Sequence, residues 1–326
     1  MSKDLSFYSS FANDIEGFIS EKQAMGYKYV KGTSLLKLFD DYICSCSISA
    51  EILTKEIVLG WTARSAHEAK ATQQGRISII RGLAGYMIRL GKLPYIYPRG
   101  MNSIDRYSYT PYIFSESEIA AIFRASDSYS LSNTSPYRHI ILPMIIRMLY
   151  CCGLRVSEAT NLTVEDVNLA EGTIYIKGTK FGKERLIPMS DNLTKRCNDY
   201  SWQVLDRKAN DAYFFPSPYG GHYDSNTVYQ HFRKIIWEAG ISHTGKGPRL
   251  HDFRHTFSVH CLKKWVINDK DLTNCLPYLS AYLGHEDMRG TQHYLRLTAD
   301  LYPNIIEKVE ESCSWMIPEV TSNETD

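Results

Sequence analysis

A proline-containing stretch divides this chain into two unequal parts, and that division limits the folds available to it. Residues 93–113 hold three prolines and show neither a helical nor a strand-like period, which is typical of a linker. At roughly 100–200 residues per domain, 326 residues predict two domains. We therefore expect a first domain over 1–92, a linker over 93–113 and a second domain over 114–300, followed by a tail over 301–326.

The first domain has a helical pattern. Apolar residues recur at helical spacing near the N-terminus, and a second apolar cluster follows at 35–39. The residues of the first set are Phe7, Phe11, Ile15, Phe18 and Ile19. These spacings predict a small helical domain.

The end of that domain combines an apolar stripe with basic residues. Ile77, Ile80, Ala84, Met87 and Ile88 have helical spacing, and Glu68 is the single acidic residue among the bases of 61–90. A helix with one apolar side and basic residues elsewhere suits the phosphate backbone of DNA. The alternative is an ordinary solvated face. The predicted DNA contacts are Arg64, Lys70, Arg76 and Arg81.

The second part is mostly helical in pattern, with one pair of strands. Ser115 followed by Glu118 predicts a capping box at the start of its first helix. The β-branched and aromatic run 173–177 can pair with 184–188 across a short turn. Apolar residues at helical spacing over 304–316 predict a short amphipathic helix. The fold class is therefore mainly α with a small β-hairpin.

Charge is distributed unevenly along the chain. The formal net charge is +1, but residues 300–326 carry −6 and the remainder carries +7, which leaves a polyanion partner open. No apolar run is long enough to span a membrane, and the N-terminus lacks a secretory signal. The eight cysteines show no CxxC spacing, which favours reduced thiols and a cytoplasmic location.

Four short groups in the second domain could carry chemistry. They are the run GLRVSE at 153–158, Lys180 in the turn of the hairpin, HDFRH at 251–255, and LGH at 283–285 with Tyr294 nine residues later. His251 and His255 have a spacing that could hold zinc, but no glutamate follows His251 as in a zinc protease, so we expect no metal.

Taken together, these groups resemble the tyrosine recombinase (phage integrase) family. The shared feature is the order Arg…Lys…His-x-x-Arg…His…Tyr in GLRxSE, HxxRH and LGH contexts, over about residues 115–300. Residues 1–92 stand where the family has its helical core-binding domain, so the order of the domains extends the resemblance to them. It implies a site-specific DNA recombinase that cleaves and rejoins DNA through a 3′-phosphotyrosine and uses no cofactor.

The resemblance also implies a role for each residue. Tyr294 is the expected nucleophile, and Arg155 and Arg254 are the expected phosphate clamp, because a guanidinium offers paired donors to phosphate oxygens. Lys180 is the expected general acid for the 5′ oxygen. His251 is expected to handle the tyrosine proton and His285 to donate to the phosphate.

Other residues compete for these roles. Tyr278, Tyr282 and Tyr302 are the neighbouring tyrosines, and Lys177 and Lys183 flank Lys180. Spacing relative to the family favours Tyr294 and Lys180. We expect a structural role for His255, a backbone contact near Arg155 for Glu158, and a surface or helix-packing role for Asp252.

The resemblance further implies partners. Family members act as tetramers on double-stranded DNA, so we expect a homotetramer or a mixed tetramer, with 304–316 as a docking helix. The run LPYLSAYLGH resembles transposon-borne members. Two other functions stay open, a type IB topoisomerase-like relaxation of DNA and a catalytically silent DNA-binding accessory protein. Against the silent protein, every catalytic position is filled.

Overall fold

The structure is a computed structural model that describes residues 6–101, 110–178, 184–205, 209–245, 247–285 and 289–301. Contacts along the backbone divide the chain into two units, Met1–Thr110 and Pro111–Asp326. Each unit has its own buried apolar core. The helix expected over 304–316 lies outside the described residues.

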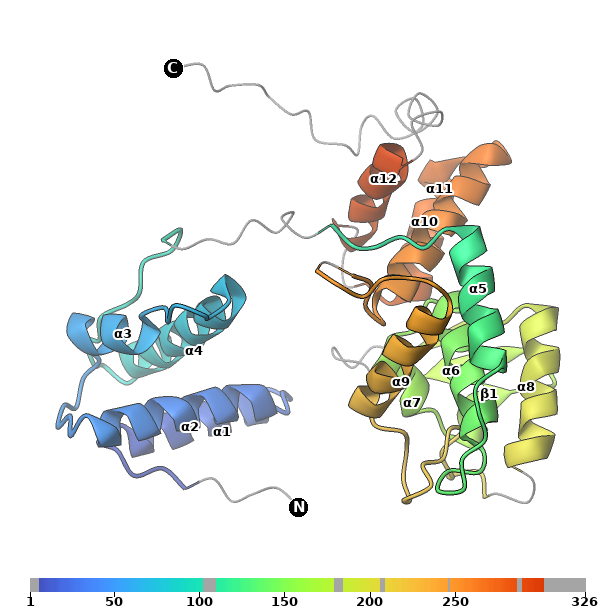
Figure 1. The fold of residues 1–326 in the computed structure, drawn as a ribbon. Helices are drawn as coiled ribbons and strands as arrows, with labels where there is room; N and C mark the ends of the chain where they lie inside the picture. The colour runs from blue at the N-terminus through green and yellow to red at the C-terminus, as the bar shows by residue number, and fades with distance from the viewer. Residues whose placement is uncertain are drawn as a thin grey trace. The chain divides into compact units, whose positions relative to one another are not determined.

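Unit 1 is a group of helices packed on one long helix. Helix α4 contacts α1, α2 and α3 (Figure 1). Four members of the predicted apolar stripe, from Ile77 to Met87, are buried, because helical spacing places them on one side of α4. The fifth, Ile88, is 42% exposed. The helical pattern of this region is thus confirmed. The helices are α1 (Ala12–Ala24), α2 (Val30–Ser45), α3 (Lys55–Thr62) and α4 (Lys70–Arg89).

The segment after α4 packs back onto unit 1. Residues 93–101 form no helix or strand, as their prolines predict. Tyr97 is nevertheless buried within the core of unit 1. The first half of the predicted linker is therefore attached to the helices that precede it.

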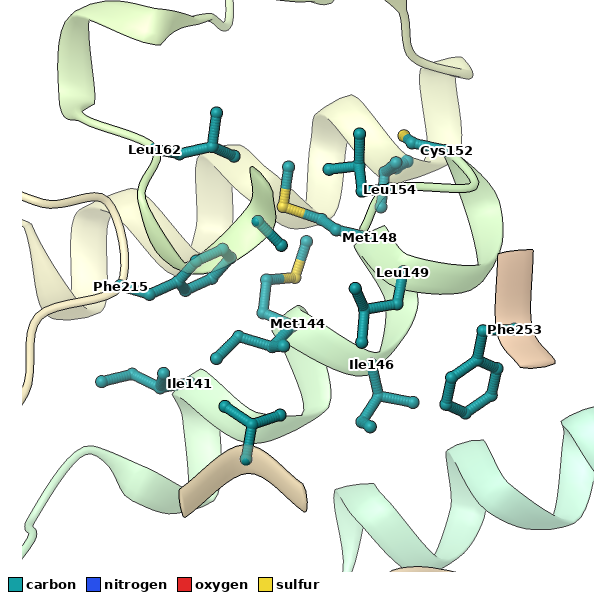
Figure 2. Close-up of a cluster of buried hydrophobic side chains, with 14 of the residues drawn as sticks. Ile141, Met144, Ile146, Met148, Leu149, Cys152, Leu154, Leu162, Phe215 and Phe253 are labelled. Atoms are coloured by element: carbon teal, nitrogen blue, oxygen red, sulfur yellow. The ribbon is translucent and has the colours of Figure 1, made fainter. Parts of the chain in front are cut away.

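Unit 2 is built around helix α6 (Arg138–Cys151). Every residue from Ile141 to Leu149 is buried, and the helix contacts α5, α7, α8 and α10. Figure 2 shows Met144 and Met148 of α6 among side chains from later segments, including Phe215 and Phe253. A helix that is apolar on all sides is stable only inside a core, so α6 is the support for the elements around it.

The first helix of unit 2 begins where the sequence predicts. The Ser115 hydroxyl accepts a hydrogen bond from the Glu118 amide at 3.2 Å, and the Glu118 carboxylate accepts one from the Ser115 amide at 2.7 Å. This capping box satisfies two amides at the start of α5 (Glu116–Asp127) that have no partner within the helix.

The sheet of unit 2 is small and antiparallel. Strands β2 (Thr173–Ile176) and β3 (Arg185–Pro188) pair in the register Thr173↔Pro188 and Ile176↔Arg185, which confirms the predicted hairpin. A third strand, β1 (Val167–Asn168), pairs with β2. It was not predicted, because a two-residue strand carries no readable period.

The last three helices of unit 2, α10 to α12, contact one another (Figure 1). Helix α11 also contacts β3. The three helices carry most of the HDFRH run, residues 276–283 of the LPYLSAYLGH run, and Tyr294, so their packing decides where these side chains meet. The mainly helical fold with a small sheet is confirmed. The remaining elements are α7 (Val156–Thr160), η1 (Val164–Asp166), α8 (Asp191–Val204), α9 (Ser225–Glu238), α10 (Asp252–Ile267), α11 (Leu272–Leu283) and α12 (Arg289–Leu301).

Candidate active site

Arg155 lies at the start of α7 and is held there by Glu158. The Glu158 carboxylate accepts the Arg155 amide at 2.9 Å and the Arg155 Nη1 group at 2.7 Å. One carboxylate thus caps the helix and restrains the guanidinium. The Arg155 side chain stays 31% exposed, so its other donors are open to an approaching anion.

Glu158 lies among three guanidinium groups. Arg185 donates to both of its oxygens, at 3.1 and 2.8 Å, and Nη1 of Arg254 lies 4.0 Å away. Burial alone raises the pKa of this carboxyl, but the hydrogen bonds and charges of Arg185 and Arg155 lower it to about 2. Glu158 is therefore ionised at every working pH.

Arg254 is almost completely buried, with 1% of its surface exposed. Its Nη1 group donates to the Gly153 carbonyl at 2.8 Å, and its Nη2 group donates to the Leu283 carbonyl. Two of its five N–H groups are used in this way, which fixes the plane of the guanidinium. Burial, followed by the positive charge of Arg155, lowers its pKa to about 10, so it remains charged at neutral pH.

The turn that carries the Gly153 carbonyl needs a glycine. Gly153 has a φ of +57°, in the left-handed region. A Cβ atom there would also meet the Phe257 ring at 2.6 Å. The glycine of the GLRVSE run therefore allows the close approach that places Arg254 beside Glu158.

Tyr294 is buried, with 3% of its surface exposed, and its ring is surrounded by histidines. The His285 ring stacks on it at a centroid distance of 5.9 Å, and the His255 ring is tilted against it at 5.6 Å. Burial raises the pKa of the phenol, whereas the nearby Arg254 and Ser258 side chains lower it. The arginine thus favours the phenolate that a nucleophilic attack requires.

Local structure holds the rings of His285 and His251 in place. His285 follows Gly284, which ends α11 at a φ of +66°, and its Nδ1 lies 2.9 Å from the Thr291 hydroxyl. His251 immediately precedes α10, and its ring lies 4.8 Å from that of His255. Part of the His251 side chain is exposed, but the rest of its ring is packed against protein. This partial burial, followed by the positive charges of Arg254 and Arg155, lowers its pKa to about 4. At neutral pH it is a free proton acceptor.

The geometry is thus a buried phenol beside two arginines that share one carboxylate, with the rings of His255 and His285 against it. The profile of the phage integrase family matches residues 113–300, which is more than half of the chain and covers all of these groups. The chain belongs to the phage integrase family, the tyrosine recombinases. It is an enzyme of the tyrosine-type site-specific recombinases.

Full-length relatives agree with the profile. The recombinase is 27% identical to an integrase/recombinase of Sinorhizobium fredii, y4rB, over 93% of this chain and 98% of that protein. It is also 27% identical to the tyrosine recombinase XerD of Pseudomonas putida, over 86% of this chain and 88% of XerD. Both matches extend well beyond unit 2 into unit 1.

Solved structures share the fold. The XerH site-specific recombinase, bound to a palindromic difH substrate after cleavage, has a TM-score of 0.62 at 19% identity, covering 86% of this chain and 78% of XerH. The Tn1549 transposon integrase, in complex with transposon right-end DNA, has a TM-score of 0.62 at 13% identity, covering 90% of this chain and 99% of the integrase chain. At these identities the likeness concerns the fold.

The remaining predicted residues of the recombinase fall into two groups. Lys180, with Lys183 and Tyr302, lies outside the described residues. The predicted DNA contacts Arg64, Lys70, Arg76 and Arg81 lie in unit 1, and the three arginines donate to carbonyl groups of their own unit. They stay predictions.

The competing residues have other contacts. Tyr278 is 76% exposed, and the Tyr282 hydroxyl donates to the Pro188 carbonyl at 3.4 Å. Lys177 pairs with Glu165 and Asp166 at 2.7 and 2.8 Å, and these two acids raise its pKa. None of these three touches Tyr294 through a contact that the described structure shows.

Three residues differ from, or add to, the sequence-based expectation. His255, expected to be structural, contacts the rings of both Tyr294 and His251. Asp252 is buried, which leaves the helix-packing role of the two that were expected, and its carboxylate accepts the Arg249 amide at 2.7 Å ahead of α10. Arg185 is a further residue of the site. Its only signal in the sequence is its place directly after the predicted hairpin turn.

The described residues contain neither a cluster of metal-binding side chains nor a membrane-spanning helix. Among them, no three His, Cys, Asp or Glu side chains gather in a way that could hold a metal ion. In the same residues, no helix is long and apolar enough to cross a membrane.

Proposed function

We propose that this recombinase cleaves and rejoins double-stranded DNA through a covalent 3′-phosphotyrosyl intermediate on Tyr294. The observation that carries the proposal is the position of the Tyr294 phenol beside Arg254, which shares Glu158 with Arg155. A phosphodiester seated on the two guanidinium groups would present its phosphorus to that phenol. The XerH and Tn1549 complexes with DNA support the choice of partner.

The proposed reaction balances without a cofactor. The phenol oxygen forms a bond to phosphorus, the bond from phosphorus to the 5′ oxygen breaks, and a free 5′ hydroxyl leaves. The proton lost by Tyr294 passes to a neutral histidine, for which His251 is our candidate, and Lys180 supplies the proton to the 5′ oxygen. Arg155, Arg254 and His285 bind the non-bridging oxygens. Attack by a 5′ hydroxyl of another strand reverses these steps and rejoins the DNA.

The biological setting that we propose is the movement of a mobile element by integration, excision or transposition. Support comes from the LPYLSAYLGH run and from the similarity to y4rB and the Tn1549 integrase. We further propose that unit 1 binds DNA through Lys70 and its neighbours, and that four copies, identical or mixed with related recombinases, act together on two DNA sites.

A trapping experiment tests the chemistry. Duplexes that bind the protein would be selected from a random pool and from the DNA flanking its own gene, then nicked so that the freed 5′ end diffuses away. Incubation in EDTA and denaturing electrophoresis reveal any covalent adduct. We expect an adduct with the wild type, none with Tyr294→Phe, and labelling that places the linkage at the 3′ side of the break.

The matched control is Tyr278→Phe, because Tyr278 is an exposed tyrosine of the same unit. It should form adduct at the wild-type rate. An adduct that persists in Tyr294→Phe would move the nucleophile to another tyrosine. Salt-sensitive binding to the selected duplexes with no adduct from any variant would instead favour the silent accessory protein.

A further inference from the structure

Arg185 occupies a position in the site that none of the assigned roles explains. It is the first residue of β3, and only 9% of its side chain is exposed. Burial of an arginine is unfavourable unless its charge and its donors find partners. The partners of Arg185 come from two different parts of unit 2.

The first partner is Glu158. The two Nη groups of Arg185 donate to the two carboxylate oxygens at 3.1 and 2.8 Å, a paired contact that fixes the carboxylate plane. The same oxygens hold Arg155 through its amide and its Nη1 group. Arg155 is therefore oriented by a carboxylate that is itself oriented by Arg185.

The second partner lies 97 residues away in sequence. The Nε group of Arg185 donates to the Tyr282 carbonyl at 2.8 Å, in the last turn of α11. The turn that follows carries Gly284 and His285, and a Cβ atom on Gly284 would meet the Arg185 guanidinium at 3.0 Å. Arg185 thus packs against the turn that places His285.

The backbone of Arg185 belongs to a third feature. Arg185 pairs with Ile176 at the base of the hairpin, and the connection between these strands contains Lys180. Arg185 therefore links three places. Its side chain contacts Glu158 near the start of α7 and the end of α11 before His285, and its backbone lies at the base of the hairpin whose connection contains Lys180.

We infer that Arg185 is a positioning residue for strand cleavage, which holds the Glu158 carboxylate charged and oriented so that Arg155 faces the scissile phosphate. The inference rests on the proposed function, since it gives Arg185 a role in that same reaction. The opposing explanation is a purely structural link between β3, α7 and α11. The two explanations differ in what happens to Glu158 when the pH falls.

The pH dependence follows from the groups that face Glu158. These are Arg155 from the start of α7, Arg185 from β3 and Arg254 from α10, with the His251 ring near enough to interact by charge. Without Arg185, burial raises the pKa of Glu158 from about 2 toward the range of an ordinary or buried carboxyl. Lowering the pH through that raised pKa neutralises Glu158 and releases Arg155.

The first test is single-turnover cleavage of the nicked substrate by Arg185→Gln and Arg185→Lys at pH 5 to 9, with DNA at saturation. We expect Arg185→Gln to slow cleavage by about 10–100-fold at pH 7, by analogy with the loss of groups that orient the ligands of metal ions. We also expect a further decline below pH 6 that the wild type lacks. Arg185→Lys keeps the charge, so its acid-side decline should be smaller.

The second test needs no DNA cleavage. The carboxyl carbons of the glutamates, labelled with ¹³C, are titrated by NMR in the wild type and Arg185→Gln, with Glu158→Gln identifying the resonance. The titration of Glu158 should move to higher pH in Arg185→Gln. Thermal melting confirms that each variant is folded at the pH of measurement.

Each outcome decides the inference. A Glu158 titration that stays where it is in the wild type overturns it, as does a slower Arg185→Gln enzyme whose pH profile is parallel to that of the wild type. If the wild type forms no adduct, the proposed function fails. A shifted Glu158 titration would then still establish the arrangement on which the inference depends.

Discussion

The two units use arginine in opposite ways. In unit 1, Arg76 donates to the Trp61 and Ala63 carbonyls and pairs with Glu68, and Arg81 donates to the Tyr97 and Pro98 carbonyls. These bonds fasten the loop after α3 and the segment after α4 to the helices. Arg76 and Arg81 therefore mainly hold segments of their own unit together.

In unit 2, three arginines gather around one carboxylate. Arg155, Arg185 and Arg254 surround Glu158, so three positive charges face one negative charge in a largely buried place. The excess of two positive charges makes this an attractive place for a phosphate. What distinguishes the two units is therefore the positive charge that the neighbouring carboxylate leaves uncompensated in unit 2, and not the mere presence of bonds to the chain, since Arg254 also donates to two backbone carbonyls.

The largest effect should come from the buried arginine of unit 2. Arg254→Lys keeps a positive charge but loses the planar fork, so we expect single-turnover cleavage to fall by about 10²–10³-fold, by analogy with the loss of one oxyanion donor. Affinity for the selected duplex should change little, because the charge remains. Quench-flow cleavage and fluorescence anisotropy measure the two quantities.

Arg124→Lys is the matched control, since Arg124 is exposed on α5. It should cleave at the wild-type rate. If Arg254→Lys cleaved normally, or if the control lost as much activity, the arginines of unit 2 would be no different from surface charges and the comparison would collapse.

The next effect concerns stability in unit 1. Arg76→Gln removes the bonds to two backbone carbonyls, which should lower the free energy of unfolding of this unit by about 1–3 kcal/mol. Cleavage at saturating DNA should stay within twofold of the wild type. Urea unfolding, followed by the fluorescence of the buried Trp61, measures the change.

Arg89→Gln provides the contrast within the same helix. Arg89 pairs with Glu21 at 2.6 Å, but its side chain is 55% exposed, and such surface pairs contribute little to stability because water screens them. If Arg76→Gln and Arg89→Gln destabilised the unit equally, the bonds of Arg76 to backbone carbonyls would contribute no more than an exposed ion pair.

Local features of unit 2 were predictable from the sequence. The Ser115–Glu118 capping box and the hairpin of β2 and β3 depend on residues that lie close together in the chain. The order of the four motifs also indicated the family, because the match depends on residue types and spacing. What these predictions share is that no distant contact was needed to make them.

The remainder of the site depends on contacts between distant segments. Arg185 meets Tyr282 across 97 residues, and the His255 ring meets Tyr294 only because α10 and α12 pack together. The sequence shows a histidine next to Arg254 and an arginine after a turn, but it does not show which way either side chain faces. For the same reason, the basic residues of unit 1 were predicted as DNA contacts although several bind their own backbone.

A pH effect should separate the histidines of the two units. Burial, and then the neighbouring positive charges and histidines, lower the pKa of His255 to about 3. Between pH 6.5 and 3, the unfolded chain binds a proton that the folded chain does not, so stability is lost as the pH falls from 6.5. His255→Gln should therefore reduce the loss of stability between pH 7 and pH 5 by about 1–2 kcal/mol.

His67→Gln is the control from unit 1, because His67 is exposed there. Its loss of stability between pH 7 and pH 5 should equal that of the wild type. Chemical unfolding at the two pH values measures the difference. A His255→Gln variant that is as acid-sensitive as the wild type would mean that another buried group, such as His251, dominates the acid response.

The smallest effect should come from an exposed basic residue of unit 1 that is among the predicted DNA contacts. Lys70 is exposed at the start of α4, whereas Arg81 on the same helix is tied to the Tyr97 and Pro98 carbonyls. If Lys70 contacts a phosphate, Lys70→Gln should weaken DNA binding about equally for all sequences and reduce the slope of log affinity against log salt by about 1. Arg81→Gln should leave that slope unchanged, and Lys28→Gln, at another exposed lysine of unit 1, controls for the loss of net charge. A slope reduced by Arg81→Gln as much as by Lys70→Gln would show that an internally bonded arginine still faces DNA, which is the observation that would break the contrast between the two units.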